Sequence, residues 1–108
     1  MIICCHLCLL TDGSWGRFPI AEVDEGGTVR SLRLCPDGLE EIGGMTFVGG
    51  VMLCGVADCV SGAEVKSRAD FASQFAGNGV GVGRGPVCVM RGADLNTFCG
   101  TFRKQTRF

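Results

Sequence analysis

Glycine is the feature that most constrains how this chain can fold, since it occupies 18 of the 108 positions. Its usual share in proteins is roughly 7%. Glycine weakens the interior of helices and strands by roughly 0.5–1 kcal/mol relative to alanine, and it favours turns. We therefore expect short elements joined by glycine-rich connections. The length leaves room for one small domain, residues 1–108, because a domain usually holds roughly 100–200 residues.

Turn signals divide the first 38 residues into short strands. Residues 24–27, Asp-Glu-Gly-Gly, separate the segments 17–23 and 28–35, as the loop of a β-hairpin does. Pro36-Asp37-Gly38 marks a second turn, because proline presets φ and glycine accepts a positive φ. Residues 1–10 form a mostly apolar run that predicts a buried first strand.

Residues 62–76 have the pattern of an amphipathic helix. Ser61 and Glu64 have the spacing of a capping box at its start, and Gly77 supplies a stop at its end. The apolar residues that recur at helical spacing are Val65, Ala69, Phe71, Ala72, Phe75 and Ala76. With the strands, this helix predicts an α+β fold of short antiparallel strands and one helix.

Other segments give conflicting local signals. Residues 77–85 carry glycine at every second position, which suits neither a packed strand nor a rigid loop. A faint six-residue rhythm over 42–65 has too few rows to stack as a β-helix. The segment 86–90 has the pattern of a last strand, and the tail 101–108 is expected to fray. These conflicts predict a chain that is only partly ordered, and they are compatible with the product of a dubious open reading frame.

Charge and motifs exclude several classes of function. The chain has 10 basic and 11 acidic residues, and this balance predicts no nucleic-acid partner. A single histidine leaves little for acid–base catalysis. The adjacent carboxylates Glu40-Glu41 and Asp24-Glu25 are typical of solvated turns, and no phosphate-binding loop is present in the sequence. We therefore expect no enzymatic activity and no catalytic or cofactor-binding residues.

The eight cysteines raise the question of metal binding. No convincing secretory signal precedes them, so we expect reduced thiols and a cytoplasmic location; in a secreted chain they could instead form four disulfides. Cys5 and Cys8 form a C-x-x-C pair, and Cys54 and Cys59 a C-x4-C pair. Four thiolates could hold a structural zinc ion, whereas buried thiols are the simpler interpretation. This pattern predicts a small binding module stabilised by thiols or by zinc.

Two further segments suggest partners. Residues 42–57 are free of charge, although a membrane helix needs about 20 apolar residues. A small membrane-associated protein anchored by 42–57 is therefore a second alternative. At the other end, Thr106 and Phe108 match the loose pattern of a ligand for a PDZ groove. None of these patterns assigns a specific biochemical function.

Overall fold

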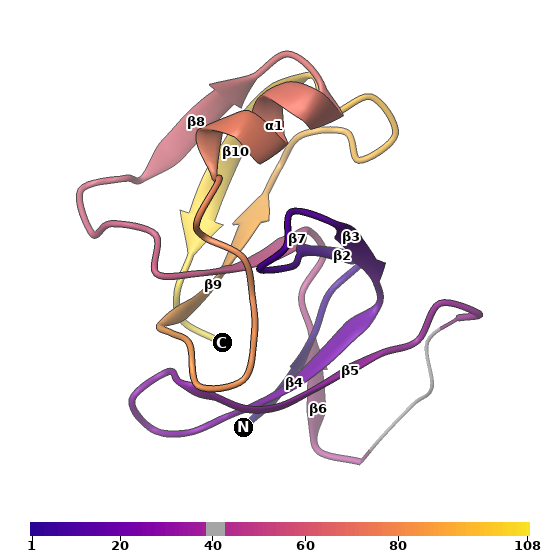
Figure 1. Ribbon diagram of the computed structural model, residues 1–108, viewed down its shortest axis with the longest axis vertical. Coiled ribbons are helices and arrows are strands. Elements are labelled where there is room, and N and C mark those ends of the chain that lie inside the picture. The colour runs from indigo at the N-terminus through magenta and orange to yellow at the C-terminus, as the bar shows by residue number, and fades with distance from the viewer. Residues whose placement is uncertain (39–42) are drawn as a thin grey trace.

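The computed structural model describes residues 1–38 and 43–108 as two β-sheets and one short helix (Figure 1). The smaller sheet has four strands in the order β5-β4-β1-β6, and the larger has six in the order β3-β2-β7-β9-β10-β8. The elements are β1 (Ile2–Cys4), β2 (Leu7–Leu9), β3 (Trp15–Arg17), β4 (Pro19–Val23), β5 (Val29–Leu34), β6 (Met45–Phe47), β7 (Val51–Cys54), β8 (Gly62–Val65), α1 (Arg68–Gln74), β9 (Val87–Arg91) and β10 (Gly100–Gln105).

The strand pairing agrees with the expected fold class in part. Most neighbours are antiparallel, including the β4–β5 hairpin that the Asp-Glu-Gly-Gly loop predicts. Two pairs, β1–β6 and β2–β7, are parallel, which the sequence analysis did not anticipate. Both sheets are therefore mixed, and the molecule is richer in β-structure than the predicted arrangement implies.

Three segments pass from one sheet into the other at a shared corner. β1 leads into β2 at His6, β3 leads into β4 at Phe18, and β6 leads into β7 at Gly49 and Gly50. The Phe18 amide donates to the His6 carbonyl (2.9 Å), and the Leu7 amide donates to the Gly50 carbonyl (3.2 Å). Gly50 has a φ of 146°, and a side chain there would overlap the Met90 carbonyl oxygen. Glycine is therefore required where β6 turns into β7.

Three groups of buried side chains define the layers. The interior cluster lies between the sheets and contains Ile3, Cys5, Cys8, Ala21, Val23, Val29, Val48, Met52, Cys54, Val80, Val87 and Val89. The aromatic cluster lies on the other face of the six-stranded sheet, under α1, and contains Leu9, Val51, Leu53, Val56, Val65, Phe71, Phe75, Cys88, Met90, Phe98 and Phe102. The outer cluster, on the far face of the four-stranded sheet, contains Cys4, Ile20 and Cys35.

Strands buried on both faces explain the uncharged segments. Along β7, Val51 and Leu53 enter the aromatic cluster, whereas Met52 and Cys54 enter the interior cluster. A strand covered on both sides has no solvent-facing position for a charge. The N-terminal run is apolar for the same reason, although it forms two strands in two sheets rather than the single strand expected.

The helix predicted over 62–76 is wrong in its first half. Gly62–Val65 is the edge strand β8, paired with β10, and α1 covers only Arg68–Gln74. The N-cap is Ser67, whose hydroxyl accepts from the Asp70 amide (3.1 Å), so Ser61 and Glu64 form no capping box. Pairing with β10 satisfies the backbone of 62–65 and overrides its helical pattern, which is a weak signal against tertiary contacts.

The tail that was expected to fray is ordered through β10. This strand lies between β9 and β8, and its Phe102 is completely buried. β9 is accordingly a strand, as predicted, but not the last one. The glycine-rich segment 77–85 is an irregular connection whose Val80 enters the interior cluster and pairs with Leu10.

Candidate functional site

The structure brings three of the four predicted zinc ligands into one cluster. Cys5, Cys8 and Cys54 belong to the interior cluster, whereas Cys59 is exposed in the connection between β7 and β8. Side chains three residues apart on a straight strand point to opposite faces. The bend at His6 removes this alternation, so both thiols of the C-x-x-C pair point into the same interior.

The structure does not bring all four cysteines together. Among residues 1–38 and 43–108, no group of three or more histidine, cysteine, aspartate or glutamate side chains could hold a metal ion. A structural zinc site needs four such ligands in tetrahedral geometry. The described residues therefore do not fit the zinc that the cysteine spacing suggested.

The buried thiols are held in their neutral form. Burial raises the pKa of Cys8 to about 12 and that of Cys88 to about 11, and it also raises the pKa of Cys5, Cys4 and Cys54. All eight cysteines are free thiols. A thiol reacts and binds metals as the thiolate. At neutral pH these side chains therefore act as small apolar residues.

His6 has a positioning role at the corner. Its Nδ1 accepts from the Gly50 amide (3.3 Å). The ring lies 4.9 Å from the Phe47 ring in a T-shaped contact and 6.4 Å from the Phe18 ring. The imidazole is therefore held against the corner by a backbone amide and two aromatic rings.

Of the acidic pairs singled out in the sequence, the structure describes Asp24-Glu25. Glu40 and Glu41 lie outside the described residues. Asp24 accepts from the amides of Gly26 and Thr28 (both 2.9 Å) and pairs with Arg30 (3.0 Å). These interactions, the Thr28 hydrogen bond most of all, lower the pKa of Asp24. Its carboxylate organises the hairpin loop.

Among the described residues, β6 is an edge of the four-stranded sheet with no strand on its outer side. It pairs with β1 on one side, and the Val48 amide that follows it donates to the Cys4 carbonyl (2.8 Å). Because backbone groups alternate along a strand, Thr46 and Val48 face β1, whereas the N–H and C=O groups of Met45 and Phe47 point away from the sheet. The Phe47 side chain is 43% exposed and Met45 is half-buried.

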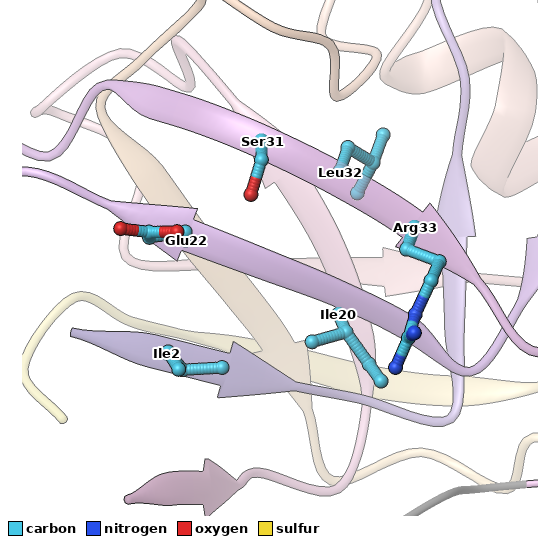
Figure 2. A pocket seen from close by; sticks show the side chains of 6 residues that line it. All are labelled: Ile2, Ile20, Glu22, Ser31, Leu32 and Arg33. Atoms are coloured by element: carbon cyan, nitrogen blue, oxygen red, sulfur yellow. The ribbon is translucent and has the colours of Figure 1, made fainter. Parts of the chain in front are cut away.

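A shallow groove lies on the outer face of the same sheet, over β1, β4 and β5. Its volume is about 360 Å³, and its lining is Ile2, Ile20, Glu22, Ser31, Leu32 and Arg33. Figure 2 shows the Arg33 side chain extending from β5 across β4 towards Ile20. Ile2 and Met45 are register partners and both pack against the outer cluster, whereas no β6 residue lines the groove.

Sequence reasoning missed the β6 edge and gave membrane association through residues 42–57 as one alternative for its segment. Within the described part of the chain, no helix is long and apolar enough to cross a membrane. Residue 42, the first of that segment, lies outside the described residues. The clue to the edge was the short uncharged segment 45–48 bounded by glycines, a pattern that does not distinguish an edge strand from a buried one.

The C-terminal motif lies against the body of the molecule. Thr106 is exposed, whereas Phe108 is half-buried and packs against the interior cluster. Gln105 belongs to β10, and its side-chain amide donates to the Arg107 carbonyl (2.8 Å). Capture of Phe108 by a PDZ groove would have to break its contact with the interior cluster.

Comparisons of the chain with protein-family models, with curated proteins and with solved structures found no match.

Proposed function

We propose that the chain is a small binding module, stabilised by reduced interior thiols, that binds an extended segment of a partner protein by strand addition at β6. The observation that carries this proposal is the open edge of β6, which has outward backbone groups and two accessible apolar side chains, Met45 and Phe47. An extended peptide gains main-chain hydrogen bonds from such an edge, and its alternate side chains pack beside it.

The charge pattern of β6 supports this use of the edge. Sheet edges that are protected from other strands usually carry lysine, proline or an inward-pointing charge. The stretch from Gly43 to Ala57 contains none of these residues. The accessible side chains of Met45 and Phe47 offer apolar contacts to the side chains of the added strand.

The length of β6 favours a peptide over a second copy of the chain. The strand has three residues, so two copies joined edge to edge would share only a short ladder. A stable dimer buries roughly 1,200–2,000 Å². A peptide needs a short edge and a few side-chain contacts.

Peptides selected from a random display library on the purified chain test this proposal. We expect apolar side chains at alternate positions of the selected peptides and slower hydrogen exchange at the amides of Met45 and Phe47. Phe47→Pro removes one outward N–H while sparing the bonds to β1, and it should weaken binding about tenfold or more. Leu34→Ala, at an exposed apolar residue of β5, is the matched control and should bind normally.

Two results would contradict strand addition by a peptide. Protection of amides away from β6 would place the binding surface elsewhere. If the chain self-associates and Phe47→Pro abolishes that self-association, the strand that adds to β6 belongs to a second copy of the chain.

A further inference from the structure

The positive charge of this nearly neutral molecule is concentrated at its C-terminal end. Residues 84–108 contain five basic residues and one acidic residue, Asp94, whereas residues 1–83 contain five basic and ten acidic residues. Three of the five, Arg91, Arg103 and Lys104, lie on the neighbouring strands β9 and β10. Overall net charge conceals this separation.

Arg91 and Arg103 are directly opposite each other in the β9–β10 ladder. Directly opposite residues of antiparallel strands share one face of the sheet, and like charges in such a pair destabilise it. In the described residues, the ion pair between Arg30 and Asp24 is the one salt bridge, so no carboxylate there neutralises the two guanidinium groups. The pair thus has an electrostatic cost that a bound anion would remove.

The Arg91 side chain is already oriented by neutral acceptors. Its Nε donates to the Gly49 carbonyl (3.1 Å), and its Nη1 donates to the Gln105 side-chain oxygen (2.6 Å). A guanidinium has five N–H donors, so three remain for a ligand. Because these two bonds fix the side chain, an anion would not have to order it on binding.

A hollow of about 370 Å³ lies at this pair of arginines. Its lining consists of Arg91, Gly92, Arg103, Lys104 and Gln105. Gly92 presents backbone without a side chain, and its φ of 108° suits glycine. The hollow is therefore bordered by both arginines and by the bare backbone of Gly92.

We propose that this hollow binds a phosphate group between Arg91 and Arg103. Guanidinium N–H groups match phosphate oxygens in paired, charge-assisted hydrogen bonds, and two arginines can hold one tetrahedral group from two sides. The phosphate is either inorganic phosphate or the phosphate of a monoester, since both present the same oxygens. This site is separate from the β6 edge and does not depend on strand addition.

Titration of the folded chain with inorganic phosphate, followed by NMR of the arginine Nε–H groups, tests the site. We expect the Arg91 and Arg103 signals to shift with phosphate and not with chloride at equal ionic strength. Arg103→Gln should weaken phosphate binding about tenfold, the effect of losing a charge-assisted hydrogen bond. Arg107→Gln removes the same charge outside the hollow and should leave phosphate binding within twofold of the unmodified chain.

The melting temperature is a second readout, which distinguishes a specific phosphate site from nonspecific electrostatic attraction. Phosphate should raise the melting temperature of the unmodified chain and of Arg107→Gln but not that of Arg103→Gln. Phosphoserine distinguishes the sources, since tighter binding of phosphoserine assigns the hollow to a monoester and equal or weaker binding assigns it to free phosphate. Unchanged Arg91 and Arg103 signals, or equal losses in Arg103→Gln and Arg107→Gln, would overturn the proposal.

Discussion

The two faces of the six-stranded sheet are covered by different chemistry. The interior cluster consists of aliphatic side chains and the thiols of Cys5, Cys8 and Cys54, whereas the aromatic cluster contains four phenylalanines with Trp15 packed against it. Facing sheets pack about 10 Å apart, so the space between them suits small and branched side chains. Aromatic rings fill the space between the helix and the sheet.

The side chains of the aromatic cluster also make contacts with preferred geometries. Phe71 contacts Trp15, Phe75, Phe98 and Phe102 with ring centroids 4.8–5.8 Å apart. The Arg68 guanidinium lies 5.2 Å from the Trp15 ring and 5.0 Å from the Phe98 ring. Such contacts have preferred geometries and add to simple burial. Directional ring contacts therefore hold the short helix in place, whereas the interior cluster is held by the close packing of small side chains.

The largest effect is expected from the centre of the aromatic cluster. Phe71 is completely buried, so Phe71→Ala should lower the free energy of unfolding by roughly 3–5 kcal/mol. Ile3→Val, in the interior cluster, should cost roughly 0.5–1.5 kcal/mol. Urea denaturation of both variants measures the difference. Equal losses would show that the two clusters do not differ in this way.

Alkaline pH should act on the interior thiols. Cys8 has a pKa near 9.0 when unfolded and about 12 when folded. A pKa raised by folding contributes stability that is complete below pH 9 and is lost as the pH rises through the folded value. Each such thiol should lower the free energy of unfolding by about 1.4 kcal/mol per pH unit above pH 9. Unfolding curves from pH 8 to 11 check this slope, which Cys8→Ala should reduce; an unchanged slope would contradict neutral burial.

A polar hydroxyl placed in the interior cluster should lower the free energy of unfolding less than the loss of the Phe71 ring does. Cys5 is completely buried, and the structure describes no hydrogen-bond partner for its thiol. Cys5→Ser should destabilise the chain by roughly 1–3 kcal/mol, because the hydroxyl is left without a partner. Cys59→Ser, at an exposed position, should stay within about 0.5 kcal/mol of the unmodified chain in the same denaturation assay. Similar losses in both would place Cys59 in the core.

The smallest effect concerns the start of the helix that covers the aromatic cluster. Ser67→Ala removes the cap on the Asp70 amide and should cost about 1 kcal/mol. Ser61→Ala should change stability by less than about 0.5 kcal/mol, because Ser61 is exposed and lies before β8. Thermal unfolding of the two variants compares the sites. A larger loss of stability in Ser61→Ala than in Ser67→Ala would indicate that the helix begins at residue 62.

The sequence by itself determined features that depend on neighbouring residues. The hairpin around Asp24 and the turn at Pro36-Asp37-Gly38 follow from the φ preferences and local hydrogen bonds of these residues, and the Gly38 amide donates to the Cys35 carbonyl as such a turn requires (3.1 Å). The apolar pattern also located the strand at Val87–Arg91 and the helical turns from Arg68 to Gln74. These signals span only a few residues.

Only the tertiary structure decided the features that depend on residues far apart in the sequence. Residues 62–65 became a strand because β10 was available to pair with them, and β10 itself was ordered by burial of Phe102 between distant elements. The open edge at β6 and the opposition of Arg91 to Arg103 are likewise matters of strand order and register. No local pattern encodes which strands become neighbours. Burial and backbone pairing across the whole chain select them, and both candidate binding sites arise from that selection.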